Sequence, residues 1–136
     1  MRIYVASFFD TRARLRPHAD TLWHRGYEVV SSWLNEITKP SHMTTEEFWR
    51  KLARKDLAEI QSADLVIVDT LDVTPRGGRE VEMGYALARH QATSVWLVGP
   101  VRNVFHELAD RRFENWVQVL KALPAINGKP KMSPKP

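Results

Sequence analysis

Two carboxylates occupy positions in the sequence where they could do acid–base or nucleophilic chemistry. Asp56 lies on an apolar helical stripe, four residues after Leu52 and four before Ile60, where a buried carboxylate is unfavourable unless it is paired. Glu82 lies in the first turn of a predicted helix and borders that helix's apolar stripe. A desolvated carboxylate beside a second one has a raised pKa, as a proton donor at neutral pH requires.

Each carboxylate also has an ordinary structural explanation. Glutamates near a helix start commonly interact with the helix dipole, and Glu80 in the same turn is expected to be solvated. Asp56 could form an ion pair with Arg54 or Lys55. The spacing alone therefore leaves a structural and a catalytic interpretation open for both residues.

The residues that precede Glu82 predict a ligand-binding loop. Gly77 and Gly78 allow backbone amides to approach a ligand closely, and the helix N-terminus adds the positive end of its dipole. Neither the dinucleotide-binding nor the P-loop spacing is present. Asp69 and Asp72 follow an apolar run, where an Asp commonly caps a turn. Taken with the two carboxylates above, they predict an acidic crevice.

The elements that must position these residues alternate between strand and helix. Residues 65–68 are apolar without alternation, as expected for a central strand buried on both faces. The alternation predicts an α/β fold with an open parallel sheet and helices on both faces. Strands are expected at 2–7, 27–31, 65–68 and 94–98, and helices at 11–25, 44 or 45 to 61, 79–90 and 113–123.

The expected helices carry further signals at their ends and along their faces. Gly26 is expected to cap the first helix, and Val81, Tyr85 and Ala88 are expected to form the core stripe of the third. In an open parallel sheet, ligands bind beyond the carboxyl ends of the strands. Functional residues should therefore cluster at 7–11, 69–78 and 99–103, and in the first turn of the helix after Gly78.

Length and composition limit the classes of protein that this chain could be. Its 136 residues fit one domain at 1–126, followed by a flexible, basic, proline-rich tail at 127–136. Three of the four formal positive charges come from this tail, so duplex nucleic-acid binding is disfavoured. No apolar run is long enough for a membrane span, and a strand at the N-terminus leaves no room for a signal peptide. The absence of cysteine favours a reducing cytoplasm.

Metal and cofactor chemistry is not expected. His18 and His24 are six residues apart on one predicted helix, off a single face. The other histidines, His42, His90 and His106, are isolated in the sequence. We therefore predict no metal site and no cofactor.

Several motifs together resemble the nucleoside 2-deoxyribosyltransferase family, including its 2'-deoxynucleoside 5'-phosphate N-hydrolase branch. The resemblance implies a flavodoxin-like (Rossmann-like) sheet of five strands, whereas the residues alone predict four. It also implies a homodimer or higher homo-oligomer with shared sites, and deoxynucleosides or deoxynucleotides and free nucleobases as ligands. The matching segments are Ile3-Tyr4-Val5-Ala6-Ser7, Asp56-Leu57 with Ala63-Asp64, Asp69-Thr70-Leu71-Asp72-Val73, Glu82-Met83-Gly84-Tyr85-Ala86-Leu87 and Asn103-Val104.

The resemblance also implies individual roles. Glu82 would be the nucleophile on the sugar, and Tyr4 would hydrogen-bond to it. Asp56 would contact the base and handle its proton. Asp72 would bind the sugar 3'-hydroxyl, and Asn103 would reach the site of a neighbouring subunit.

The sequence departs from both branches of the family. The chain ends in Lys135-Pro136 where the transferases have a terminal aromatic residue that helps to hold the base, so that contact is not expected. The phosphate-dependent branch has a Gly- and Arg-rich cradle after strand one, of which Ser7 and Arg12 are the remaining phosphate partners. Phe8 could stack an acceptor base or belong to the core. Arg12, Arg14 and Arg16 could equally form a solvated helix face.

The predicted reaction proceeds through a glycosyl ester on Glu82 with retained configuration, as in retaining glycosidases. Transfer to another base is favoured over hydrolysis because the segments around Asp69 and Asn103 match the transferase branch better. Two rival interpretations are a non-catalytic nucleotide-binding module and a phospho-receiver domain with Asp69 as its acceptor. The receiver would need an acidic pair after strand one, where this chain has Ala6-Ser7-Phe8-Phe9.

Overall fold

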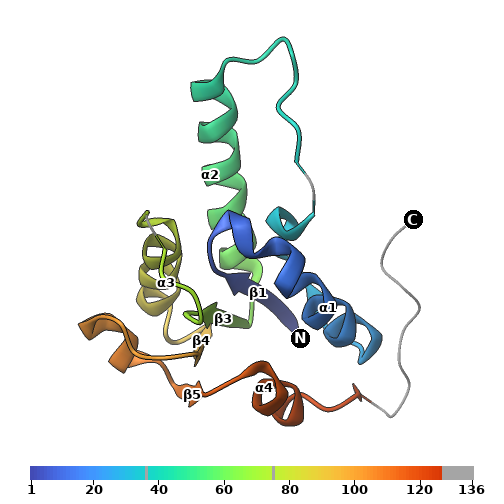
Figure 1. The fold of residues 1–136 in the computed structure, drawn as a ribbon, viewed down its shortest axis with the longest axis vertical. Coiled ribbons are helices and arrows are strands. Elements are labelled where there is room, and N and C mark those ends of the chain that lie inside the picture. Colours follow the sequence, from blue (N-terminus) through green and yellow to red (C-terminus); the bar gives the residue numbers. More distant parts are fainter. Residues whose placement is uncertain (36, 75, 127–136) are drawn as a thin grey trace.

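A computed structural model describes residues 1–35, 37–74 and 76–126, and its centre is a five-stranded parallel sheet (Figure 1). The strand order is β2-β1-β3-β4-β5, the flavodoxin-like arrangement of doubly wound sheets. The predicted fold class is therefore confirmed. The strands are β1 (Arg2–Ala6), β2 (Glu28–Val29), β3 (Leu65–Asp69), β4 (Ser94–Val98) and β5 (Arg111–Phe113).

The middle strand, β3, explains why its sequence shows no alternation. All five of its residues are buried, because β1 and β4 flank it and helices cover both of its faces. Ile3 pairs with Leu65 on one side, and Leu65 pairs with Ser94 on the other. This register brings the carboxyl ends of β1 and β3 to the same edge of the sheet.

In the described part of the chain, four α-helices cover the two faces of the sheet in pairs. Helix α1 packs with α4, and helix α2 packs with α3 (Figure 1). Their bounds are α1 (Arg12–His24), α2 (Thr45–Ser62), α3 (Gly78–Ala88) and α4 (Trp116–Ala122), and short 3-10 turns lie at η1 (Phe9–Thr11), η2 (Ser32–Leu34) and η3 (Val104–Leu108).

Capping residues fix the start of α2, near the expected position, and the end of α1, where Gly26 was expected. Thr44 caps α2, where its hydroxyl accepts from the Glu47 amide and the Glu47 side chain accepts from the Thr44 amide. Gly26 follows the end of α1 with a positive φ of 100°, a conformation that favours glycine at a helix C-terminus. Local chemistry therefore sets where these two helices start and stop.

Two apolar stripes expected from the sequence are wrong in detail. In α3 the buried residues are Arg79, Met83 and Ala86, whereas Val81 is 65% exposed. The helix is thus rotated from the expected orientation, so that Met83 faces the sheet. In α2 only Ile60 is buried, because the first turns of this helix extend beyond the sheet (Figure 1).

The C-terminal part of the chain also differs from expectation. Residues 111–113 form the edge strand β5, and the last helix starts at Trp116 rather than at Phe113. A three-residue strand with one buried side chain leaves no recognisable pattern in the sequence. The predicted tail at 127–136 lies outside the described residues. Across the described ranges, no helix has both the length and the apolar character to cross a membrane.

Candidate active site

A pocket of about 210 Å³ opens beyond the carboxyl end of β1, beside the first turn of α3. The strand order reverses between β1 and its neighbour β3, which is where doubly wound sheets bind their ligands. The pocket includes five of the residues predicted from the sequence. Its lining residues are Ser7, Phe8, Phe9, Trp33, Asp56, Arg76, Gly78, Arg79 and Glu82.

Tyr4 and Glu82 are in direct contact inside this pocket region. The Tyr4 hydroxyl donates a hydrogen bond of 2.7 Å to Glu82 Oε2, although the residues are 78 positions apart in the sequence. Tyr4 is fully buried, and its burial and the neighbouring Glu82 carboxylate raise the pKa of its phenol. Tyr4 therefore stays protonated and acts as a permanent donor to Glu82.

Burial and mutual repulsion perturb the two carboxylates, Asp56 and Glu82. Burial, together with the negative charges of Asp56 and Glu59, raises the pKa of Glu82 to about 8, although the Tyr4 hydrogen bond lowers it. Burial and the Glu59 charge raise the pKa of Asp56 to about 6, and Lys55 opposes them. Because the carboxylates interact, both pKa values belong to the pair, which holds about one proton at neutral pH.

Asp56 has an unused polar atom at the pocket. Its Oδ1 is buried and has no hydrogen-bond partner among the residues that the structure describes. The alternative considered from the sequence, an ion pair with Arg54 or Lys55, does not form. A buried oxygen without a partner is unfavourable unless a ligand or water satisfies it, and such atoms cluster at functional sites.

A second cavity of about 230 Å³ adjoins the same carboxylates between α2 and α3. It shares Asp56, Gly78 and Glu82 with the first pocket. Its remaining lining residues are Ala53, Leu57 and Val81. The carboxylate pair therefore borders two adjoining spaces, both of them mainly apolar.

The glycine pair at the start of α3 leaves open space at the pocket. Gly77 is the N-cap residue, and Gly78 lines both cavities. A Cβ atom at either glycine would meet no other atom within 4 Å, so crowding inside the protein does not require glycine here. The space beside the helix start can instead hold part of a ligand.

Asp69 and Asp72 do not line the pocket. Asp69 is fully buried, and Arg14 donates to both of its oxygens at 2.9 Å. Trp116 Nε1 also donates to Asp69 at 2.7 Å, so the protein itself occupies this carboxylate. Asp72 pairs with Arg14 at 2.9 Å and is half exposed. The expected acidic crevice therefore contains Asp56 and Glu82 alone of these four residues, and Arg14 is an ion-pairing residue, not merely part of a solvated face.

The segment after β1 brings aromatic and polar groups to the pocket. The Thr11 hydroxyl donates a hydrogen bond of 2.7 Å to the Phe8 carbonyl and lies 3.1 Å from Ser7 Oγ. The Arg12 guanidinium lies 3.6 Å from the centre of the Phe9 ring. Arg12 Nη1 is buried and has no hydrogen-bond partner within the described ranges. Phe8 and Phe9 supply apolar surface.

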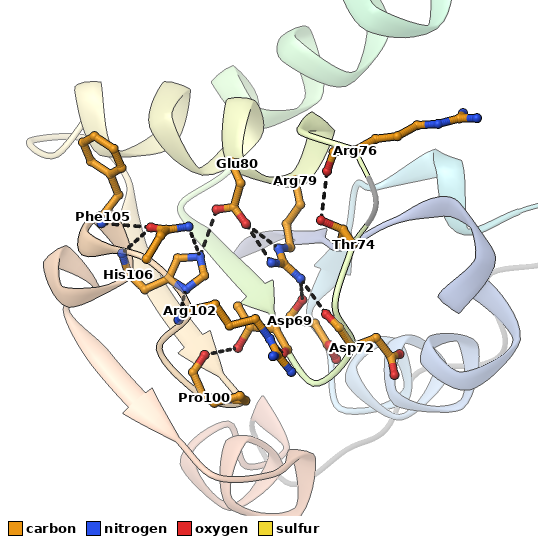
Figure 2. Close-up of polar contacts among 12 residues, drawn as sticks. Asp69, Asp72, Thr74, Arg76, Arg79, Glu80, Pro100, Arg102, Phe105 and His106 are labelled. Carbon is orange, nitrogen blue, oxygen red and sulfur yellow. Dashed lines mark hydrogen bonds and ion pairs between the residues drawn. The ribbon is translucent and has the colours of Figure 1, made fainter.

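Sequence reasoning missed a polar network at the start of α3 (Figure 2). Arg79 is 3% exposed and donates twice to Glu80 Oε1, at 2.9 and 2.7 Å. Glu80, which we expected to be solvated, also accepts from His106 at 2.9 Å. The helical pattern gave no signal for this network, because its partners come from distant segments.

Asn103 lies at the start of η3, away from the pocket of its own chain. Its side-chain oxygen caps η3 by accepting from the amides of Phe105 and His106, at 2.9 and 3.2 Å. The structure contains one chain, so the expected contact with a neighbouring subunit's site stays a prediction. Within residues 1–35, 37–74 and 76–126, no group of three or more His, Cys, Asp or Glu residues is arranged to hold a metal ion.

The chain is similar to a known protein family and to several solved structures. A family model described as nucleoside 2-deoxyribosyltransferase matches residues 3–105. A 2-deoxyribosyltransferase from Bacillus psychrosaccharolyticus has a similar structure, with 24% identity, a TM-score of 0.72 and coverage of 97% of this chain and 100% of that one. A CMP N-glycosidase from Clostridium botulinum has 17% identity, a TM-score of 0.57 and coverage of 90% and 98%.

A conserved protein from Enterococcus faecalis V583 shows a further structural likeness, with 14% identity, a TM-score of 0.64 and coverage of 90% and 96%. At these identities the three structures support the fold. No curated protein matches the chain.

Proposed function

Since the chain belongs to the nucleoside 2-deoxyribosyltransferase family, we propose that it cleaves the N-glycosidic bond of 2'-deoxynucleosides and transfers the deoxyribosyl group to another base. The family match confirms the expected enzyme class, an N-glycosyl transferase or hydrolase. The single observation that supports the catalytic assignment is the buried contact between Tyr4 and Glu82 beside Asp56, at the end of β1.

The first half of the proposed reaction forms a covalent intermediate. A carboxylate oxygen of Glu82 attacks C1', and a C1'–O bond forms as the C1'–N bond breaks through an oxocarbenium-like transition state. The electron pair of the broken bond goes to the base, which takes the proton held by Asp56. The products of this half are a glycosyl-Glu82 ester, a free base and an ionised Asp56.

The second half reverses these roles. A nitrogen of an incoming base attacks C1', and the bond to Glu82 breaks and returns the electron pair to the carboxylate. Asp56 takes the proton that the incoming base loses. Two inversions at C1' give overall retention of configuration, as in retaining glycosidases.

The number of protons in the site matches what the first step requires. At neutral pH the carboxylate pair holds about one proton, and the higher pKa of Glu82 places that proton mainly on Glu82 in the free protein. The reactive form needs the proton on Asp56 and an ionised Glu82. The hydrogen bond that the Tyr4 hydroxyl donates to Glu82 lowers the pKa of Glu82 and so favours transfer of the proton to Asp56.

A second candidate function is hydrolysis of 2'-deoxynucleoside 5'-monophosphates. It is favoured by Arg12 Nη1, which is buried without a hydrogen-bond partner among the described residues and whose guanidinium lies against Phe9 of the pocket, and by the Ser7 hydroxyl in the pocket lining. Arg76 adds a positive charge to the pocket lining, and its side chain points away from the Arg79 network (Figure 2). These groups could hold a 5'-phosphate, and water would then replace the acceptor base.

We also propose a homodimer or larger assembly with shared sites. The exposed apolar side chain of Val81 lies at the rim of the second cavity, and Trp49 on α2 is 64% exposed. A partner chain that covered these side chains would also enclose the cavity beside Glu82. The mass in solution, measured by light scattering, tests this proposal, and a monomer would contradict it.

One experiment separates these functions. The protein is incubated with a panel of deoxynucleosides and their 5'-monophosphates, with and without a free acceptor base, and the products are separated by chromatography. A swapped nucleoside indicates transfer, and free base without an acceptor indicates hydrolysis. Binding of these compounds without any base release, at high protein concentration, would support a non-catalytic nucleotide-binding module instead.

A further inference from the structure

The turn at residues 69–72 is held from both sides by two arginines. Arg79 comes from the first turn of α3, and Arg102 comes from the segment between β4 and η3. Their guanidinium groups donate to four consecutive backbone carbonyl groups of this turn. The contacts are Arg79 Nη1 to Asp69 O at 3.3 Å and to Asp72 O at 3.0 Å, Arg102 Nε to Thr70 O at 2.7 Å, and Arg102 Nη2 to Leu71 O at 3.2 Å.

His106 links these two arginines (Figure 2). It is fully buried, and its Nδ1 accepts a hydrogen bond of 2.9 Å from the Arg102 backbone amide. That bond leaves the ring proton on Nε2, which donates to Glu80 Oε2 at 2.9 Å. Glu80 Oε1 in turn accepts both bonds from Arg79. One buried imidazole therefore connects the backbone at Arg102 to the Arg79 guanidinium.

The orientation of Arg79 matters because this residue lines the pocket. Arg79 and Glu82 are three positions apart on α3, so they lie on the same side of the helix. The Arg79 guanidinium is planar and uses one edge for Glu80 and its remaining nitrogen for the turn. Loss of the Glu80 contact would let this group rotate and move the pocket wall beside Glu82.

We propose that His106 is a positioning residue for the reaction, which acts through Glu80 to fix Arg79 and the turn at residues 69–72. It lies outside the pocket lining and contacts none of the groups assigned to the chemistry. The proposal rests on the proposed function, because it assigns His106 a role in aligning the substrate with Glu82. Misplacement of reacting groups by about 1 Å can lower a rate on the order of 10²-fold.

The test compares His106→Ala with His106→Gln and with a control in the core. Gln retains an amide donor near the position of Nε2, whereas Ala removes it. His106→Ala is expected to lower kcat by about 10-fold or more and to change KM by less than about 3-fold, and His106→Gln should recover most of the loss. Val119→Ala, in the buried face of α4, is the control for lost stability and should keep kcat while it lowers Tm.

Glu80→Gln is a second variant at a partly exposed position, in case His106→Ala does not fold. Its amide would face the Nε2 proton of His106 as a second donor, so it should lower kcat as His106→Ala does. The proposal would be overturned if kcat were unchanged in both variants or if only KM changed. It would also be overturned if the loss of kcat were no larger than in Val119→Ala. A His106→Gln variant no better than His106→Ala would have the same consequence.

A readout that does not depend on turnover separates this inference from the proposed function. Arg76 is exposed and follows the turn in the sequence, so trypsin can cleave after it. The initial rate of this cleavage should rise in His106→Ala relative to the wild type and to Val119→Ala. Equal cleavage rates would contradict the positioning role, whereas a wild-type protein with no activity would refute the proposed function alone.

Discussion

The proton shared by Asp56 and Glu82 predicts a bell-shaped pH dependence of kcat/KM. The reactive form holds one proton on the pair, so the rate should rise with pH as the first proton leaves, at about 6, and fall as the second leaves, at about 8. With these values the singly protonated form reaches roughly four-fifths of the enzyme near neutral pH. One pH unit beyond either limb, the rate should be about tenfold below the plateau.

Asp56→Asn provides the decisive variant for this prediction. Without Asp56 no titrating proton donor remains, so the falling limb at high pH should disappear. The Asp56 charge no longer raises the pKa of Glu82, so the rising limb should lie below 8. The plateau should fall by on the order of 10²–10⁴-fold, the usual contribution of general acid catalysis.

The assay is the initial rate of base release or base exchange at low substrate concentration, followed by chromatography over a series of buffers. Glu107→Gln is a matched control, because this exposed carboxylate lies on η3 and pairs with Arg112. It should reproduce the wild-type profile. A bell shape that persists in Asp56→Asn would refute the assignment of the falling limb, and a flat wild-type profile would refute the shared proton.

Three further predictions follow from other contacts. Tyr4→Phe removes the hydrogen-bond donor to Glu82, so kcat should fall about 10-fold or more. The rising limb of the pH profile should move to higher pH, because the lost hydrogen bond lowers the pKa of Glu82 in the wild type. An unmoved limb would contradict this. Glu82→Gln should raise Tm at pH 9 more than at pH 5. Folding raises the pKa of the Glu82 carboxyl, so the wild type loses stability as the pH rises through about 8, whereas the variant does not. Equal changes in Tm at the two pH values would argue against this. Asp69→Asn should lower the free energy of unfolding by about 3 kcal/mol in a urea titration, because it leaves Arg14 without its buried partner. The kcat of the folded fraction should stay within about threefold of the wild type. A stable variant without activity would instead indicate that Asp69 takes part in the reaction.

The sequence singles out Asp56 and Glu82 because their signals are local. Asp56 stands out as a carboxylate on an apolar stripe, and Glu82 as one that borders the expected core stripe of α3, although the structure rotates this helix so that Met83 faces the sheet. Both lie at the pocket. The contact between Tyr4 and Glu82 came from the family resemblance instead, because no local pattern links residues 78 positions apart.

The predictions that failed depend on long-range packing. An Asp at the end of a strand has the same local sequence whether it faces a ligand or, like Asp69, an arginine from another helix. The rotation of α3 depends on which side chain fits against the sheet, and Met83 takes that place instead of Val81. Glu80 likewise looks solvated until the fold brings His106 to it.

The central claim is that Glu82 forms a covalent bond to the sugar. Rapid acid quench of the enzyme during turnover of a deoxynucleoside, followed by proteolysis and mass spectrometry, tests this claim most directly. The account predicts a deoxyribosyl ester on Glu82, which is absent in Glu82→Ala together with nearly all turnover. An adduct on another residue, or full activity of Glu82→Ala, would contradict it.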